Sequence, residues 1–152
     1  MGERYLKTVR LLAECLQGFE RMSGESVRRL GLTHAQFDII ATLGNTPGMT
    51  HKELGEKTLI TKGTLTGVIE RLEAKGLVAR SRCLNDKRAF YVALTEEGEQ
   101  TFADVFPIVI AQGQQMFAAY GEADFEALEA PLRKLKQLIA THSTDLQPED
   151  AS

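Results

Sequence analysis

The residues of this chain that most clearly could take part in binding or chemistry are lysines and arginines clustered in one segment. Residues 61–90 contain seven lysines and arginines against three acids, a local charge of +4. Because the whole chain carries −3, the remaining residues carry −7. A basic patch on an acidic body is typical of nucleic-acid binding, although a solvated charged surface would show the same pattern.

No catalytic pattern accompanies these cations. The sequence has no nucleophile elbow, phosphate-binding loop, metal motif or paired-carboxylate signature. The three histidines, His34, His51 and His142, are scattered, so we expect neither a metal site nor a cofactor. Cys15 and Cys83 are too few and too far apart for a disulfide framework or a zinc ribbon. We therefore expect a protein that is not an enzyme.

The segment that holds the cations predicts a helix-turn-helix. A capping box at Thr50–Glu53 opens a short helix, which a tight turn at Thr58–Ile60 ends. Thr61 can cap a second helix that runs to about Lys75, and Gly76 stops it. The apolar residues of this second helix recur at helical spacing and must face inward: Leu65, Val68, Ile69 and Leu72.

The outward residues of that helix are small or hydrogen-bonding, which suits close approach to base edges and phosphates in the major groove. Gly63 and Gly67 each cost about 1 kcal/mol in helix propensity, and a flush surface against DNA would explain them; a poorly formed helix near a turn is the alternative. The candidate DNA contacts on this helix are Thr61, Lys62, Gly63, Thr64, Thr66 and Arg71.

A β-hairpin with a basic tip should follow this helix. Residues 77–82 alternate like a half-buried strand, residues 84–87 form a polar turn, and residues 90–94 return. Such a hairpin would be a wing, with its tip in the narrow, electronegative minor groove. The candidate DNA contacts on the hairpin are Arg80, Arg82, Lys87 and Arg88, and Asp86 suits a partner that orients an arginine.

Helices flank this lobe on both sides. A broad apolar stripe predicts a helix from Tyr5 to about Val27, and a capping box at Thr33–Gln36 opens another. A helix that starts at about Thr95 should kink or break at Pro107. The last helix spaces its apolar residues 3-4-3-4, a helix-packing seam. These flanking helices have more apolar surface than one small lobe can cover, which predicts a dimer.

The resulting fold class is mainly α (α+β). We expect a winged helix-turn-helix lobe at residues 32–98, a helical dimerisation region at 1–31 and 99–142, and a disordered tail at 143–152. No apolar run is long enough for a membrane span, and the N-terminus lacks a signal-peptide pattern, so a cytoplasmic protein is expected.

Three motifs of this sequence together resemble the multiple antibiotic resistance regulator (MarR) family. Asp86-Lys87-Arg88 is similar to that family's Asp-x-Arg wing motif, and Leu94–Gly98 to its Leu-Thr-x-x-Gly motif. Leu32–Phe37 is similar to the opening of its second helix. The resemblance implies a homodimeric transcription regulator, a ligand-responsive repressor, that reads a pseudo-palindromic operator in double-stranded DNA. It implies that residues 61–71 form the recognition helix, that Arg88 enters the minor groove, and that Asp86 orients the wing through Arg80 or Arg82.

The family resemblance also suggests what could switch DNA binding. A small aromatic or phenolic effector could bind where the dimer helices meet the lobe, among Phe19, Met22, Phe37 and Tyr120, although a packed core is an alternative for each. Thiol sensing at Cys15 or Cys83 is a second possibility, but a reactive thiol needs an electropositive setting that Cys15 lacks. A winged helix that docks protein and a purely structural helical dimer are the alternatives to DNA binding.

Overall fold

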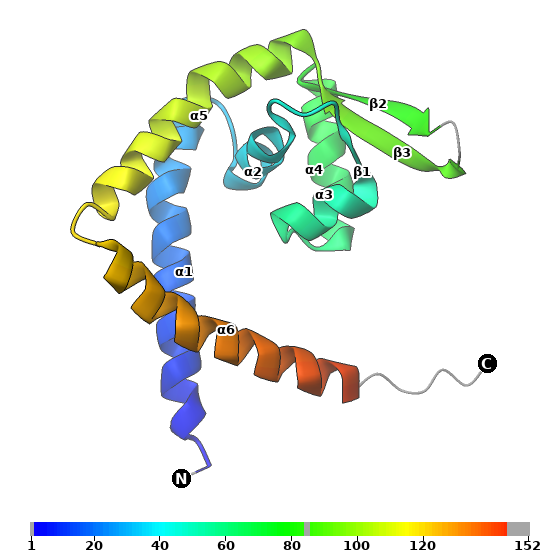
Figure 1. The fold of residues 1–152 in the computed structure, drawn as a ribbon. Coiled ribbons are helices and arrows are strands. Elements are labelled where there is room, and N and C mark those ends of the chain that lie inside the picture. Colours follow the sequence, from blue (N-terminus) through cyan, green and yellow to red (C-terminus); the bar gives the residue numbers. More distant parts are fainter. Residues whose placement is uncertain (1, 84–85, 146–152) are drawn as a thin grey trace. The chain divides into compact units, whose positions relative to one another are not determined.

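The computed structural model describes residues 2–83 and 86–145, and the side chains of residues 83, 86–89, 144 and 145 lie outside that description. The chain divides into two compact units, Met1–Gly113 and Gln114–Ser152. The helices are α1 (Arg4–Arg29), α2 (His34–Leu43), α3 (His51–Thr58), α4 (Lys62–Ala74), α5 (Glu96–Met116) and α6 (Glu122–Asp145). With one small sheet, this is the mainly helical fold class that the sequence predicts (Figure 1).

The sheet has three antiparallel strands in the order β1-β3-β2. β2 (Val78–Cys83) and β3 (Asp86–Leu94) form the predicted hairpin, which projects from the helices (Figure 1). β1 (Met49–Thr50) was not predicted, because two residues are too few to show the alternation of a strand. It pairs with β3 through Met49 and Val92 and so ties the start of α3 to the hairpin.

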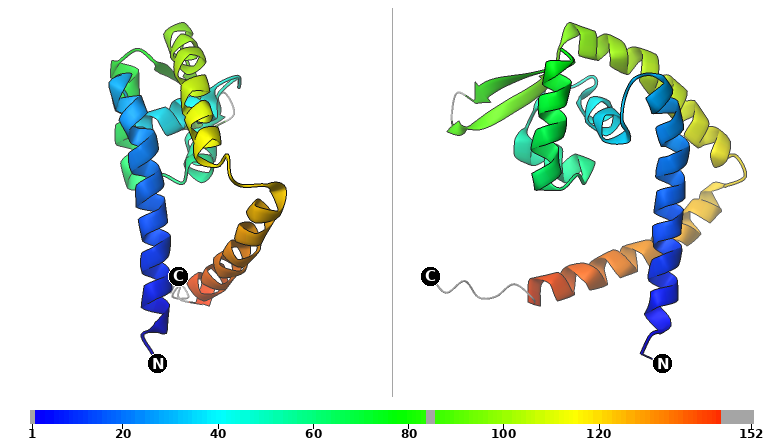
Figure 2. Two further views of the ribbon diagram at one scale, coloured as in Figure 1. Left: turned by 90° about the vertical axis from the view of Figure 1, so that its left-hand side faces the viewer. Right: turned by 180° about the vertical axis from the view of Figure 1, so that it is seen from behind.

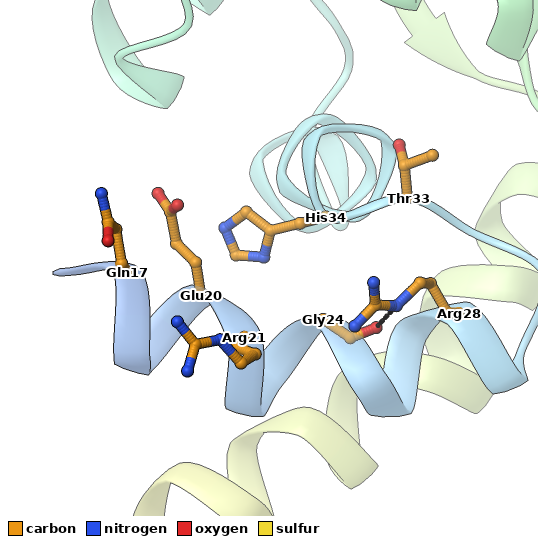
Figure 3. Close-up of a pocket in the computed structure, with 7 residues that line it drawn as sticks. All are labelled: Gln17, Glu20, Arg21, Gly24, Arg28, Thr33 and His34. Carbon is orange, nitrogen blue, oxygen red and sulfur yellow. Dashed lines mark hydrogen bonds between the residues drawn. The ribbon is translucent and has the colours of Figure 1, made fainter. Parts of the chain in front are cut away.

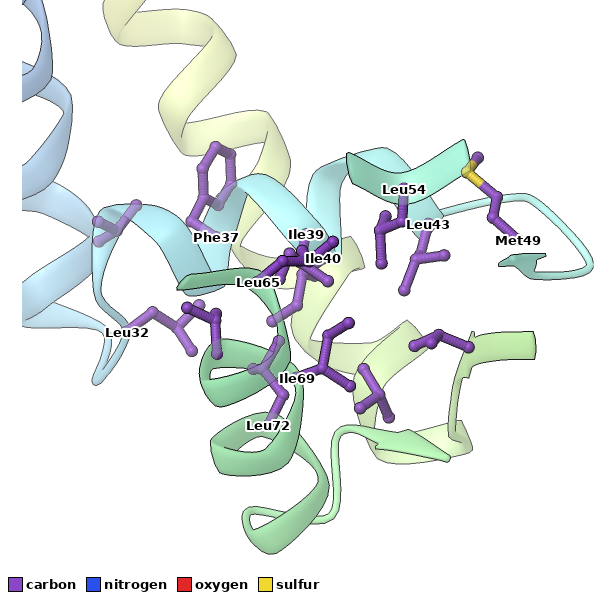
Figure 4. Packing of buried hydrophobic residues seen from close by; sticks show 14 of the residues in the cluster. Leu32, Phe37, Ile39, Ile40, Leu43, Met49, Leu54, Leu65, Ile69 and Leu72 are labelled. Carbon is purple, nitrogen blue, oxygen red and sulfur yellow. The ribbon is translucent and has the colours of Figure 1, made fainter. Parts of the chain in front are cut away.

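The core of the first unit lies among α2, α3, α4 and the sheet (Figure 4). The predicted inward stripe of α4 is confirmed, since its four apolar residues are at most 4% exposed. α2 lies between α1 and α4 in the views of Figures 1 and 2, and it contacts both. Its Ile39 and Ile40 are fully buried, so two faces of this helix are covered. Burial of such side chains, at about 1.5–3 kcal/mol each, holds α4 in place.

Of the three predicted helix caps, the one at Thr33 is as predicted, and those at Thr50 and Thr61 differ in their hydrogen bonds. At Thr33 the capping box is complete: its hydroxyl accepts from Gln36 N at 3.1 Å, and its N–H donates to Gln36 Oε1 at 3.2 Å. At Thr50 the hydroxyl accepts from Glu53 N but donates to the Glu53 carboxylate instead of completing a box. Thr61 is the N-cap residue of α4, yet its hydroxyl donates to Thr64 Oγ1.

The junction between the hairpin and α5 explains the Leu-Thr-x-x-Gly motif. The Thr95 hydroxyl donates to Gly76 O at 2.6 Å and accepts from Gly98 N at 3.1 Å, so it caps α5 and fastens it to the end of α4. A Cβ at Gly98 would overlap the carbonyl oxygen of Leu77. Gly76 itself has φ +76°, the left-handed region that favours glycine after a helix. The motif therefore holds the wing and α5 at a fixed junction.

The C-terminal helices decide two expectations. Of the two outcomes predicted at Pro107, a kink or a break, the break does not occur, since α5 runs on to Met116 and tolerates the missing backbone donor. α6 extends to Asp145, three residues into the segment expected to be a disordered tail, because its apolar spacing does not show where the helix ends. Residues 146–152 lie outside the described residues. Among the described residues, no helix combines the length and apolar character needed to cross a membrane.

Candidate nucleic-acid interface

α3, a short turn and α4 form the predicted helix-turn-helix. The turn works because Leu59 adopts the left-handed conformation, with φ 60° and ψ 13°, and its side chain is 87% exposed. His51 at the start of α3 has its Nε2 atom 3.3 Å from Thr66 Oγ1 on α4, so a polar contact crosses between the two helices. His51 was not among the predicted site residues, because a contact over fifteen positions leaves no periodic signal.

The outer surface of α4 carries the predicted recognition residues. Thr61, Lys62, Gly63, Thr64, Thr66 and Arg71 are all exposed, whereas the four apolar residues of the helix are buried. A Cβ added at Gly63 or Gly67 would meet nothing within 4 Å, so neither glycine is required by packing inside this chain. The surface near the start of α4 therefore consists of small or polar residues, and these would allow close approach to base edges.

The hairpin presents two of its predicted arginines on the side of the sheet that packs on α4. Directly opposed residues of an antiparallel pair lie on one face, and Arg80 opposes buried Val92 while Arg82 opposes Phe90. Because β2 contacts α4, Arg80 and Arg82 lie on the same side as the recognition helix. Lys87, Arg88 and Asp86 belong to β3, but their side chains lie outside the described residues.

Arg80 has a specific partner that the sequence did not reveal. Its Nε and Nη2 donate to the two carboxylate oxygens of Glu73, at 3.1 and 2.9 Å, a bidentate ion pair between β2 and α4. The hydrogen bonds from Arg80 lower the pKa of the Glu73 carboxyl, and the same bonds raise the pKa of Arg80. Glu73 therefore orients Arg80, and the prediction that Asp86 orients the wing through Arg80 or Arg82 stays a prediction, since the Asp86 side chain lies outside the described residues.

Lys75 is also committed to a structural role. Its Nζ donates to Gly31 O at 2.8 Å and to Gln36 Oε1 at 3.1 Å, so it links the end of α4 to the α1–α2 connection. The same Gln36 closes the Thr33 capping box. The positive charge counted in the sequence thus includes side chains that brace the lobe as well as side chains free to meet phosphates.

The other predicted site residues lie in separate places. Cys15 is an exposed free thiol on α1, and the side chain of Cys83 lies outside the described residues. Phe37 is 8% exposed and packs in the core, which is the alternative that the sequence left open for it. Phe19 is exposed and Met22 half-buried on α1, whereas Tyr120, in the second unit, packs against Phe117 and Phe125.

Two cavities in the first unit are lined by other residues. One, of about 470 Å³, is a polar hollow between α1 and the start of α2 (Figure 3). It mixes charges, since Arg21 and Arg28 face it together with Glu20 and His34. The second, of about 610 Å³, lies on the helix-turn-helix beside β3. Neither lining includes a residue of the predicted ligand pocket.

The fold and this surface define a winged helix-turn-helix protein, a class that binds duplex DNA. A family model described as the MarR family matches residues 32–90, the segment that contains the helix-turn-helix and most of the wing. The lobe at these residues is therefore a MarR-family domain.

Named relatives agree with this assignment. The HTH-type transcriptional regulator MhqR of Bacillus subtilis is 24% identical over 135 residues, which cover 89% of this chain and 93% of MhqR. The homoprotocatechuate degradative operon repressor of Escherichia coli is 37% identical over 76 residues, 50% of this chain and 51% of the repressor. Both names are those of proteins that regulate transcription.

A solved structure with the same fold is that of BpsR from Bordetella bronchiseptica. It has a TM-score of 0.74 and 28% identity, and the match covers 86% of this chain and 98% of BpsR. That structure concerns the regulation of BpsR's DNA binding by 6-hydroxynicotinic acid.

Proposed function

We propose that this chain is a homodimeric repressor that binds a pseudo-palindromic operator and releases it when a small aromatic acid binds. The observation that carries the DNA-binding part is the division of α4, whose apolar residues are all buried while its threonines, Lys62 and Gly63 stay exposed. Residues 32–98 would bind the DNA, and residues 1–31 and 99–142 would form the dimer.

The exposed apolar residues of α1 support the dimer. Leu6, Val9 and Leu16 are half exposed or more in the single chain, at 50%, 53% and 60%. They recur at spacings of three and seven along one helix, so a partner helix could cover them together. In the second unit, α6 likewise exposes Leu128, Leu132 and Ile139. Burial of these residues against a second copy would remove apolar surface that a monomer leaves in water.

Repression and an aromatic effector are supported by the relatives. The Escherichia coli protein that is 37% identical over half of this chain is a repressor, and the DNA binding of BpsR is regulated by an aromatic acid. A dimer would place two copies of α4 about 34–36 Å apart, one turn of DNA, which is why a pseudo-palindrome is expected.

DNA binding can be tested by fluorescence anisotropy with labelled DNA fragments from the region upstream of the gene that encodes this chain. Arg88→Ala should weaken operator binding by about tenfold or more at fixed salt, because a wing arginine in the minor groove is lost. Arg133→Ala removes an exposed arginine of α6 that lies outside the predicted DNA contacts and, one position after Leu132, off the apolar stripe of that helix; it is the matched control and should change binding by less than about twofold. Equal affinity of Arg88→Ala and the unchanged chain would refute the wing assignment.

Two further measurements complete the test: the salt dependence of the DNA affinity and the mass of the free protein in solution. Affinity should fall steeply with salt, with a logarithmic slope of about −0.9 for each phosphate neutralised. A flat salt response would instead favour a protein-docking role. Light scattering of the free chain should give twice the 16.8 kDa mass of one copy, and a monomer at micromolar concentration would contradict the proposed dimer.

A further inference from the structure

We propose that His51 is a positioning residue for base recognition: it holds the Thr66 hydroxyl of α4 in one orientation, and this fixed hydroxyl contributes to the choice of operator sequence. The inference rests on the proposed function, because it assumes that α4 faces the bases of DNA. It assigns no base contact to His51 itself, which would act on the sequence preference through Thr66.

Thr66 uses its hydroxyl differently from other helical threonines of this chain. Four of those donate to the backbone carbonyl oxygen four residues earlier, at 2.7 or 3.0 Å: Thr42, Thr58, Thr101 and Thr141. That carbonyl is a common local partner of a threonine inside a helix. Thr66 Oγ1 instead lies 3.3 Å from Nε2 of His51 on α3. A neighbouring helix therefore orients this hydroxyl.

The position of His51 is fixed by the structure on both sides of it. His51 is the first residue of α3 and directly follows Thr50, whose hydroxyl caps the helix and whose backbone pairs with β3. One turn further along α3, a Cβ at Gly55 would lie 3.3 Å from Leu65 Cδ2, so α3 and α4 pack closely beside this contact. The distance between His51 and Thr66 thus follows from the packing of the two helices.

The hydroxyl of Thr66 is on the surface that would meet DNA. Thr66 is exposed, and Gly63, three residues earlier on the same face, adds no side chain beside it. A freely rotating hydroxyl can donate to one base edge or accept from another. If His51 Nε2 accepts the Thr66 proton, the hydroxyl can only accept from a base, and if Nε2–H donates to Thr66, the hydroxyl proton is free to reach a base acceptor. Either arrangement favours some base edges over others.

The test measures sequence discrimination by the full chain. The operator is first selected from a pool of randomised duplexes, and fluorescence anisotropy then gives the affinity for it and for each of its single-base-pair substitutions. Thr66→Ala should lose discrimination at one position of each half-site by about threefold to tenfold, the value of one hydrogen bond. His51→Ala should lose a similar factor at that same position, and the double variant should lose no more, because the two side chains act as one unit.

Conservative variants separate positioning from a general effect on folding. His51→Gln should restore most of the discrimination, since its amide reaches the place of Nε2, whereas the shorter amide of His51→Asn reaches only the place of Nδ1 and should not. His34→Ala is the matched control, because His34 is also the first residue of a helix after a threonine cap, and its Nδ1 lies 3.4 Å from Ser23 Oγ. It should change discrimination at every position by less than about twofold.

Three results would overturn the inference and leave the proposed function intact. The first is a loss of affinity in His51→Ala that is equal for all sequences; a salt slope shallower by about 0.9 would then assign His51 to a phosphate. The second is discrimination that His51→Ala keeps at the position where Thr66→Ala loses it, or no loss in either variant. The third is equal discrimination by His51→Gln and His51→Asn. Failure of the unchanged chain to select any duplex would instead refute the proposed function itself.

Discussion

The Thr95 hydroxyl is the best place to test how the wing and α5 are held together. Thr95→Ala removes two hydrogen bonds, one to Gly76 O at 2.6 Å and one from Gly98 N at 3.1 Å. Gly98 is buried, so its N–H loses its partner where water cannot easily replace it. Loss of an N-cap costs about 1 kcal/mol and loss of the second bond about 1 kcal/mol more, so we expect a destabilisation of about 2–3 kcal/mol.

Urea denaturation followed by circular dichroism measures this change at a fixed protein concentration, since dimerisation makes stability depend on concentration. At roughly 2–4 °C per kcal/mol for a chain of this size, the midpoint of thermal unfolding should fall by about 4–12 °C. Thr95→Ser keeps both bonds and should cost less than about 1 kcal/mol. Thr101→Ala removes a hydroxyl that bonds only to Glu97 O within α5 and should be nearly neutral. If Thr95→Ala were as stable as Thr101→Ala, the account of this junction would be wrong.

Three further predictions concern strain, close packing and charge. Leu59→Gly should raise the free energy of unfolding by about 1 kcal/mol in urea denaturation, since it relieves a left-handed leucine that is 87% exposed; a loss of stability would contradict this. Gly98→Ala should lower that free energy by about 2 kcal/mol or more, because the new methyl overlaps the Leu77 carbonyl; an unchanged midpoint would show that the junction adapts. Burial raises the pKa of the Asp38 carboxyl, so the folded chain holds this proton more tightly than the unfolded chain, and stability falls as pH rises through that window. Asp38→Asn should therefore stabilise the chain more at about pH 7 than at about pH 3, and an equal effect at both would exclude a raised pKa.

The parts of the fold that the sequence predicted are those with local causes. The inward stripe of α4, the Thr33 capping box and the β2–β3 hairpin depend on residues a few positions apart, and their spacing is visible in the chain. The short strand β1 was missed, and the choice between a kink and a break of α5 at Pro107 was left open, because neighbouring elements decide both. A two-residue strand exists only because β3 offers it a partner, and a proline in a helix is tolerated only if the surrounding structure allows it.

The sequence by itself determined that a helix-turn-helix with a wing exists and which side chains of α4 remain outside the core. Only the tertiary structure decided which lysine and arginine side chains are held by partners inside the protein and which remain available to a ligand. Arg80 is held by Glu73, and Lys75 reaches Gly31 and Gln36 across more than thirty positions, whereas Lys52 and Lys62 line a cavity. The physical reason is that charge can be counted along a chain, but its pairing depends on distances of about 3 Å that only packed elements establish.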